Sequence, residues 1–447
     1  MAAKTAALRW LVRVGRALAV AFAVALAGWA LLRRAVSAGG RRVMVERLLG
    51  DQDVIEAAGR YSREKGVTLA AALRRAGVYA WEISPSPDTR LYFRVGVPLA
   101  GLVLRFLYGE RLRSRGEEHV PKAGGKAGVV FVINHRSNLD YVVLGHLLGE
   151  RVALSFAAGE WARFWPLGPL ARAMGSFFVR RGSGDELYRR VLERFVQTGL
   201  EGGLTPAVFI EGGLSRDGRL REPKTGLLDY ALRRFDPYGA RDLLFVPVGI
   251  NHDWVLEDGS LPSPDEPNPS GLRSVLSTTL FIVRAVRLAR RGPGRLGATA
   301  VRFGAPVSAG EWARSRDVDF RVLTPEARIE RMREFAGNLM RSIGGLVPVV
   351  PVPVVAGVLM EEPEEALPRA EIMARARALV SEMERRGAWI CFEVKDAVEA
   401  VLRLLVMRGL VVREGDLYRA APEGVKLLRF YAASISHHMP EETGEGR

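Results

Sequence analysis

Three short β-rich runs, separated by helical patterns, constrain the fold of this chain more than any other feature of its sequence. The runs are residues 128–133, 207–210 and 243–250. Helical patterns lie between and beside them, over 139–149, 185–200 and 224–235. Strands that alternate with helices are typical of an α/β domain with a largely parallel sheet. In such sheets the functional groups gather at the carboxyl ends of the strands, where His135 and Glu211 stand.

The composition limits the classes of protein to which the chain can belong. It has 447 residues, 48% of them hydrophobic, and a formal net charge of +15. It is therefore too apolar to be intrinsically disordered and long enough for two or three domains. Its one cysteine excludes an intramolecular disulfide and a metal site built on several thiolates. The positive charge indicates an acidic partner, which can be nucleic acid, an anionic membrane face or a phosphorylated substrate.

The amino-terminal segment carries a large share of the positive charge. The first 50 residues contain nine basic side chains and one acidic side chain, and residues 17–32 form an uncharged, mostly apolar run between basic flanks. A spanning helix needs about 20 residues, but arginine side chains can reach the interface from both ends. We expect residues 1–43 to be a membrane-anchor segment. A buried helix and a cleaved signal peptide are the alternatives.

Three further regions follow along the chain. We expect a helical region over 44–110, an α/β domain over 111–345 and a mainly helical module over 346–447. Residues 92–108 are apolar but interrupted by Arg94, Pro98 and Arg105. They predict a helix that lies on the core or in a membrane interface, and we favour the core.

The carboxyl-terminal module opens with an apolar run, 346–359, whose three prolines argue against a simple spanning helix. An acidic linker over 361–369 separates this run from helical patterns over 370–386 and 394–408. A hairpin around Glu-Gly-Asp and a last helix over 422–435 follow. That order resembles a winged-helix module.

The first motif with chemical potential is His135 followed by Asp140, just past the first β-rich run. A carboxylate that holds one ring nitrogen protonated leaves the other nitrogen free to accept a proton. By itself this spacing arises easily by chance. Ser137, between the two, is expected to be a helix-start hydroxyl and not a nucleophile.

Two more motifs offer positive charge and close backbone approach. Residues 175–181 end in Arg180 and Arg181, which could clamp a phosphate by paired hydrogen bonds. Residues 209–226 contain Gly212 and Gly213, which let a ligand approach the backbone. The same stretch supplies donors to a phosphate: Ser215, Arg216, Arg219 and Lys224. A fourth segment, 246–253, contains His252 and Asp253 and is a weak signal alone.

In this order and spacing the motifs resemble those of the glycerolipid acyltransferases, and within them the glycerol-3-phosphate acyltransferase group. The family pattern HRSxxDY is matched by 135–141 and GxFFIRR by 175–181. The pattern FxEGGRSRxGRxxxPKTG is matched over 209–226 at all but one defining position. The apolar-Pro-apolar strand of the fourth motif is matched by 246–250, and the segments 164–175 and 427–438 also match. The resemblance covers roughly residues 110–440.

The resemblance implies an acyltransferase core with a largely parallel sheet wrapped by helices. It implies transfer of a fatty acyl group from a thioester, on coenzyme A or acyl carrier protein, to the sn-1 hydroxyl of glycerol 3-phosphate. The product would be lysophosphatidate, in the first step of phospholipid synthesis. The enzyme would act at the cytoplasmic face of the inner (plasma) membrane, with membrane lipids as partners and without nucleic acid.

The resemblance also implies roles for the motif residues. His135 would take the proton of the attacking hydroxyl, and Asp140 would orient His135 and stabilise its imidazolium. Glu211 and Gly212 would shape the acceptor pocket. The acceptor's phosphate would meet the donors of the second and third motifs: Arg180, Arg181, Ser215, Arg216, Arg219 and Lys224. Because a thiolate leaves readily, no metal, resident cofactor or covalent acyl-enzyme is expected. Cys391, outside the motifs, is expected to be a small buried side chain.

Two residues depart from the family pattern and leave other functions open. Leu214 stands where the family usually has an arginine thought to help hold the acceptor's phosphate, and Asn138 replaces a common histidine. Lysophosphatidate, dihydroxyacetone phosphate or another lysophospholipid are therefore alternative acceptors. A nucleic-acid-binding protein that uses the 370–435 module is a remote alternative, because the 394–408 helix is nearly neutral. An inactive homologue that only docks on membranes is a third, against which the intact His135 and Asp140 argue.

Overall fold

The computed structural model describes residues 38–87, 92–122, 125–159, 167–180, 182–258 and 296–439. The expected anchor run 17–32 and Arg181 lie outside these ranges, as does most of the Pro-rich stretch that begins at 257. Within the described part, no helix combines the length and the apolar character needed to cross a bilayer.

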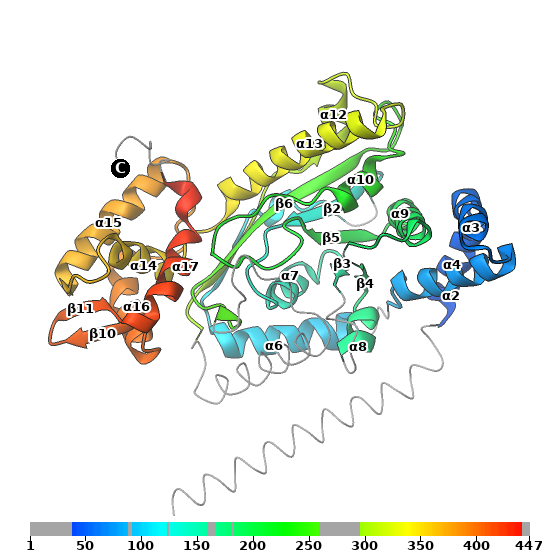
Figure 1. The fold of residues 1–447 in the computed structure, drawn as a ribbon. Helices are drawn as coiled ribbons and strands as arrows, with labels where there is room; N and C mark the ends of the chain where they lie inside the picture. The colour runs from blue at the N-terminus through cyan, green and yellow to red at the C-terminus, as the bar shows by residue number, and fades with distance from the viewer. Residues whose placement is uncertain are drawn as a thin grey trace, which may run out of the picture.

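An eight-stranded sheet forms the centre of the molecule (Figure 1). Its strand order is β1-β7-β6-β2-β5-β3-β4, and β8 pairs with β6. The neighbours β6, β2, β5, β3 and β4 run parallel, whereas β7 is antiparallel to β6, and β1 is parallel to β7. The prediction of a largely parallel sheet is therefore confirmed. The strands are β1 (Leu112–Arg115), β2 (Gly128–Ile133), β3 (Leu154–Ala158), β4 (Phe177–Phe178), β5 (Thr205–Phe209), β6 (Leu243–His252), β7 (Thr299–Phe303) and β8 (Val307–Ser308).

Helices cover both faces of this sheet. One core cluster joins Val130, Val208 and Phe245 of the sheet to the apolar sides of a large set of helices. That set is α2 (Ala38–Leu49), α3 (Gln52–Lys65), α4 (Leu69–Ile83), α9 (Glu186–Glu201), α10 (Gly226–Leu232), α12 (Ala309–Arg314) and α13 (Pro325–Leu346). On the other face, Phe131 and Ile133 pack against α6 (Val97–Tyr108) and α7 (Asp140–Leu148). The short α8 (Leu167–Ala173) follows β3.

Local sequence explains where the main helices begin. Asp185 caps α9 by accepting a hydrogen bond from the Tyr188 amide, and α9 buries one side that includes Val191 and Phe195. Thr324 caps α13 in the same way, and Pro325 occupies the first helical position, where its missing N–H costs nothing. Capping and an apolar stripe together place both helices on the sheet.

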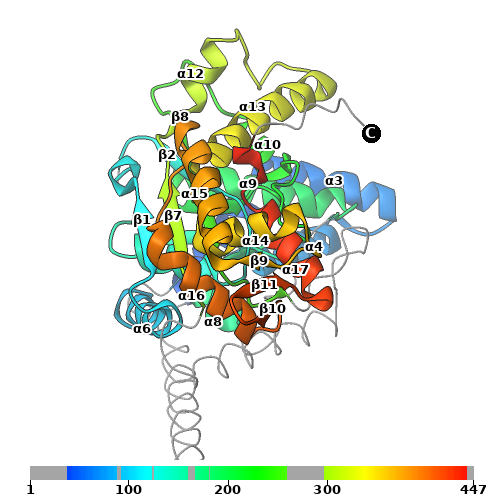
Figure 2. The ribbon, with the colours of Figure 1, turned by 90° about the vertical axis from the view of Figure 1, so that its left-hand side faces the viewer.

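The carboxyl-terminal module has its own core (Figure 2). It comprises α14 (Pro351–Glu361), α15 (Arg369–Arg385), α16 (Val394–Met407), the hairpin β10 (Val411–Glu414) and β11 (Leu417–Ala420), and α17 (Val425–Ala433). The predicted helices and hairpin are confirmed. A short strand, β9 (Leu367–Pro368), lies within the expected linker and pairs with β11 of the hairpin. The proline-rich run forms α14, whose first residue is Pro351.

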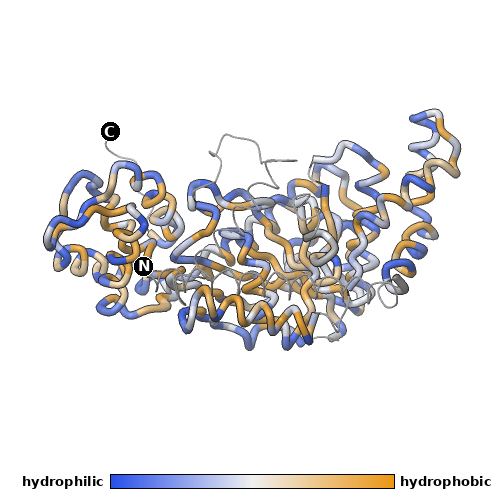
Figure 3. The backbone as a smooth tube through the Cα atoms, turned by 90° about the horizontal axis from the view of Figure 1, so that it is seen from below, coloured by the Kyte–Doolittle hydropathy of each residue, from blue (hydrophilic) through white to orange (hydrophobic). Residues whose placement is uncertain are grey.

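Helix α6, preceded by the π-helix η1 (Tyr92–Gly96), has an apolar side that the described part of the chain leaves exposed. Leu104 and Leu107 are buried against the core, but Leu99 and Leu102 are 55% and 66% exposed. In Figure 3, seen from the side on which α6 lies, the tube of this helix is largely orange. The helix thus packs on the core with one side, which is the placement favoured for 92–108, and presents apolar residues with the other.

Candidate active site

The carboxyl ends of β2, β5 and β6 bring three polar residues together. His135 follows β2 by two residues, Glu211 follows β5 by two residues, and His252 ends β6. Asn134 ties the strand ends to each other, because its side chain donates to the Ile250 carbonyl (2.9 Å) and accepts from the Ile250 amide (2.8 Å). The structure places His135 and Glu211 at this edge of the sheet, as expected.

His135 and Asp140 form a buried hydrogen-bonded pair. Nδ1 of His135 lies 2.9 Å from Oδ2 of Asp140, which also accepts from the backbone amides of Arg136 (2.8 Å) and Ser137 (3.0 Å). Oδ1 of Asp140 lies 2.6 Å from Nε2 of His252. Burial by itself would raise the pKa of Asp140, but the hydrogen bonds from the two imidazoles outweigh it and hold the pKa well below its usual value. Asp140 is therefore an ionised acceptor.

The ring of His135 is held by aromatic neighbours as well as by Asp140. It stacks on Phe209 with 3.9 Å between ring centroids and meets the edge of Tyr141 at 5.6 Å. An ionised carboxylate only accepts hydrogen bonds, so Nδ1 of His135 carries a proton and donates a hydrogen bond to Asp140. In the neutral ring, Nε2 then has the lone pair that a general base needs.

Two buried glutamates clamp the turn between His135 and Asp140 from either side. Glu211 accepts from the His135 amide through Oε1 (2.9 Å) and from the Arg221 amide through Oε2 (3.0 Å). Glu257 accepts from the Ser137 hydroxyl (2.9 Å) and the Asn138 amide (2.8 Å). Burial raises the pKa of Glu211 and that of Glu257 to about 7. Ser137 also accepts from the Leu139 amide (3.2 Å), so it is the helix-start hydroxyl that was predicted.

The carboxyl-terminal module reaches this turn through Arg136. The Arg136 side chain is 1% exposed and donates to the carbonyls of Gly218 and Ser434, the latter at 3.3 Å. Gly218 lies against α17: a Cβ there would come within 1.8 Å of the Phe430 carbonyl oxygen. The loop after β5, the turn between His135 and Asp140, and α17 therefore pack as one unit.

A cavity of about 490 Å³ opens beside His135. Its lining includes His135, Glu211 and Gly212, the aromatic residues Tyr141, Phe209 and Tyr230, and the cations Arg180, Arg189, Arg221 and Lys224. Gly212 has φ +71°, and a Cβ there would lie 2.8 Å from Cγ of Lys224. A glycine at this position therefore leaves room for the Lys224 side chain. The Lys224 ammonium has no ion-pair partner among the described residues.

The other predicted phosphate ligands occupy different positions. Arg180 lines the cavity but also binds Glu82 with two hydrogen bonds, of 2.7 and 2.5 Å. Ser215 is fully buried and donates to the Arg219 carbonyl (2.7 Å). Arg216 and Arg219 are not among the residues that line the cavity beside His135. The structure thus brings Arg180, Glu211, Gly212 and Lys224 together at His135, and places Ser215, Arg216 and Arg219 in the adjoining loop.

Three residues of the site were not predicted from sequence as site residues. Arg221 lines the cavity and donates to the Leu214 carbonyl (3.3 Å), so it places a cation next to the position that lacks the usual arginine. Glu257 accepts hydrogen bonds from the turn between His135 and Asp140, and His252 binds Asp140. His252 stood out in the fourth motif, but only the fold shows what it contacts.

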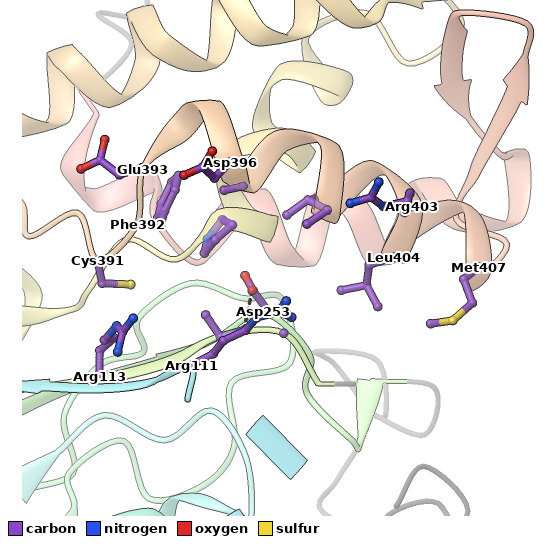
Figure 4. A pocket seen from close by; sticks show the side chains of 16 residues that line it. Arg111, Arg113, Asp253, Cys391, Phe392, Glu393, Asp396, Arg403, Leu404 and Met407 are labelled. Carbon is purple, nitrogen blue, oxygen red and sulfur yellow. Dashed lines mark hydrogen bonds between the residues drawn. The ribbon is translucent and has the colours of Figure 1, made fainter. Parts of the chain in front are cut away.

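A second cavity, of about 750 Å³, lies between β1 and α16 and shares no lining residue with the first (Figure 4). Arg111, Arg113 and Asp253 line one side, and Leu404 lies on the other. Cys391 also lines it; the side chain is half-buried, and burial raises the pKa of its thiol to about 12. The larger cavity therefore lies away from the His135–Asp140 pair.

Comparison with protein families gives two matches. Residues 111–251 match the family described as Acyltransferase, and residues 282–442 match the family described as Glycerol-3-phosphate acyltransferase C-terminal region.

Comparison with individual proteins agrees with these matches. The chain is 28% identical over 360 residues to a glycerol-3-phosphate acyltransferase of Xanthomonas campestris, with 77% of this chain and 39% of that protein covered. It is 29% identical over 344 residues to one of Aeromonas hydrophila, with 75% and 41% covered. The chain thus spans about two fifths of the length of these curated relatives. A crystal structure of the 1-acyl-sn-glycerophosphate (LPA) acyltransferase PlsC from Thermotoga maritima matches with a TM-score of 0.33 and 18% identity, over 57% of this chain and 78% of that one.

Proposed function

We propose that the chain belongs to the glycerol-3-phosphate acyltransferase family, to which its two family matches point, and that it transfers a fatty acyl group from a thioester to the sn-1 hydroxyl of glycerol 3-phosphate. The observation that carries the proposal is the buried His135–Asp140 pair at the mouth of a cavity that also holds unpaired positive charge. The family matches and the names of the curated relatives support the same substrate class.

In the proposed reaction, His135 acts as the general base. Nε2 of His135 takes the hydroxyl proton of the acceptor while the acceptor oxygen attacks the thioester carbonyl. The tetrahedral intermediate collapses, the C–S bond breaks, and the thiolate leaves with the proton that His135 returns. The Asp140 carboxylate stabilises the imidazolium formed in between, as in other base–orienter pairs.

The cations of the cavity are proposed to bind the acceptor's phosphate. Lys224 and Arg221 are the best placed, because Lys224 has no carboxylate partner among the described residues and Arg221 lies beside Leu214. Arg180, which also lines the cavity, contributes while it is held by Glu82. The donor is proposed to be an acyl thioester of coenzyme A or acyl carrier protein, used as a co-substrate without a resident cofactor or metal.

Thiol release from an acyl-coenzyme A donor, with and without glycerol 3-phosphate, tests the proposal. We expect acceptor-dependent release by the unaltered protein and none above background by His135→Ala. His119→Ala is the matched control, because His119 is exposed and lies outside the cavity. A folded His135→Ala protein with near-normal turnover refutes the assignment. A panel of lysophosphatidate and dihydroxyacetone phosphate as acceptors, with one labelled donor, decides the question that Leu214 raises.

The protein is further proposed to act at the cytoplasmic face of the inner membrane. The exposed apolar side of α6 supports this, because Leu99, Leu102 and Phe106 are exposed beside Arg105. Replacement of Leu102 by Glu should weaken flotation with anionic vesicles, whereas Ile329→Glu, at an exposed apolar residue of α13, should not. Equal flotation of the two variants contradicts the placement of α6 at the membrane.

A further inference from the structure

His252 takes no part in the steps proposed above, yet it is the second imidazole on the Asp140 carboxylate. Its Nε2 lies 2.6 Å from Oδ1 of Asp140, and its Nδ1 lies 2.6 Å from the hydroxyl oxygen of Thr299. Neither the His252 nor the Asp140 side chain is exposed to solvent. Asp140 thus has a second, fully buried imidazole as a hydrogen-bond partner besides that of His135.

The two oxygens of Asp140 have separate sets of donors. Oδ2 accepts from Nδ1 of His135 and from the amides of Arg136 and Ser137. For Oδ1, His252 is the hydrogen-bond partner that the described residues supply. Because the ionised carboxylate can only accept, Nε2 of His252 must carry a proton. The orientation of the carboxylate plane therefore depends on the His252 ring.

The ring itself is fixed from the antiparallel side of the sheet. His252 and Thr299 stand opposite each other in the β6–β7 pairing, which places the Thr299 hydroxyl at Nδ1. The Tyr108 hydroxyl lies 3.4 Å from the same nitrogen, and its ring is stacked on His252. Residues of β7 and α6 thus fix the His252 ring, which contacts the Asp140 carboxylate at Oδ1, the oxygen that does not face His135.

We propose that His252 is a positioning residue of the acyl transfer reaction, whose Nε2–H fixes the Asp140 carboxylate so that Oδ2 faces Nδ1 of His135. This inference rests on the proposed function of the same site. It assigns a role to the fourth motif, at a position that touches neither cavity.

Loss of the Nε2–H has a defined electrostatic consequence. Oδ1 of Asp140 would become a buried anionic oxygen without a donor, and burial favours the neutral acid. The charged and titratable groups around the pair are Arg136, His135, Tyr108, Asp253 and Glu257. The Arg136 guanidinium is the cation among them, but it donates to the carbonyls of Gly218 and Ser434 and does not replace the donor at Oδ1. At moderately acidic pH Asp140 would then take up a proton and cease to stabilise the His135 imidazolium.

The test compares His252→Gln with His252→Asn. The glutamine amide can reach Oδ1 in place of Nε2, whereas the asparagine amide is one methylene shorter. We expect kcat of the asparagine variant to fall about 10- to 100-fold, the loss that corresponds to one hydrogen bond to a charged group. Both substrate KM values should be unchanged, and the acid limb of its kcat–pH profile should move to higher pH. The glutamine variant should keep most of kcat and the original profile.

Two further measurements keep the inference separate from the proposed function. His438→Gln is the control for a buried histidine away from the site, since Nε2 of His438 contacts the Val347 carbonyl. Proton NMR of the substrate-free protein should show the downfield Nδ1–H signal of His135 shifted in His252→Asn and not in His438→Gln. Glutamine and asparagine variants with the same kcat, pH profile and His135 signal as the unaltered protein overturn the inference. An unaltered protein without transfer activity, but with the NMR effect, overturns only the proposed function.

Discussion

The carboxyl group of Glu211 gives a prediction in which the pH dependence of stability can be worked out from the structure. Glu211 is 1% exposed, its two oxygens accept from the amides of His135 and Arg221, and burial raises its pKa from 4.5 to about 7. Between these two values the folded protein holds a proton that the unfolded chain has released. The free energy of unfolding therefore declines as pH rises through this window.

The size of the effect follows from the pKa shift. One pKa unit corresponds to about 1.4 kcal/mol, so the Glu211 contribution falls by about 3 kcal/mol between pH 4.5 and pH 7. Glu211→Gln has no such slope, and glutamine resembles the protonated acid in offering one acceptor oxygen and one donor group. The stability of the variant relative to the unaltered protein should thus rise by about 3 kcal/mol over this range.

Urea unfolding at a series of pH values from about 4.5 to about 8 measures the difference directly. Other buried acids, such as Glu257 and Asp253, titrate in both proteins and cancel in the comparison. Glu222→Gln is the matched control, since Glu222 is an exposed carboxylate in the same loop. Parallel stability curves for Glu211→Gln and the unaltered protein would refute the reasoning, because they would mean that Glu211 is ionised or neutral equally in both states.

Three further predictions concern the catalytic pair and the packing of the carboxyl-terminal module. Asp140→Asn should lower kcat by about 10⁴-fold, the precedent for removing the orienting charge from a base, as steady-state kinetics will show. Gly218→Ala should lower the melting temperature more than Gly415→Ala: both glycines have positive φ, but only at Gly218 does a Cβ meet the Phe430 carbonyl. Arg408→Met should cost about 3–5 kcal/mol in urea unfolding, because it strands the buried Asp258 carboxylate, whereas Arg419→Met at an exposed pair should cost under about 1 kcal/mol.

The sequence allowed the centre of the site to be predicted because its signals are local. His135 and Asp140 lie five positions apart on one turn, and each strand that carries a site residue is a continuous apolar run. The helices of the carboxyl-terminal module were predicted for the same reason, since their periodicity and the hairpin turn are read over short windows. Propensity and pattern decide such elements before any tertiary contact forms.

The remaining features depend on contacts between distant segments. Arg180 was predicted as a phosphate ligand from its neighbours in sequence, but its pairing with Glu82 joins residues 98 positions apart. His252 and Glu257 act on the catalytic turn from more than 100 positions away. The strands β1 and β7 were not predicted either, and β1, at the edge of the sheet, reads Leu-Arg-Ser-Arg and lacks an apolar run. Ion pairs between distant residues, and short polar strands such as β1, produce no periodic pattern of apolar residues from which they could be predicted.

The bond from Arg136 to the Ser434 carbonyl has a consequence for the order in which the protein is made. It joins the catalytic turn to a residue 298 positions further along the chain. During synthesis the turn around His135 leaves the ribosome long before α17 has been made. Until then the Arg136 guanidinium lacks the Ser434 carbonyl as a hydrogen-bond acceptor. The turn around His135 therefore gains this acceptor only after α17 has been made. A chain that stops after Gly424 lacks that acceptor, and we expect its His135 turn to be less stable than that of the unaltered chain.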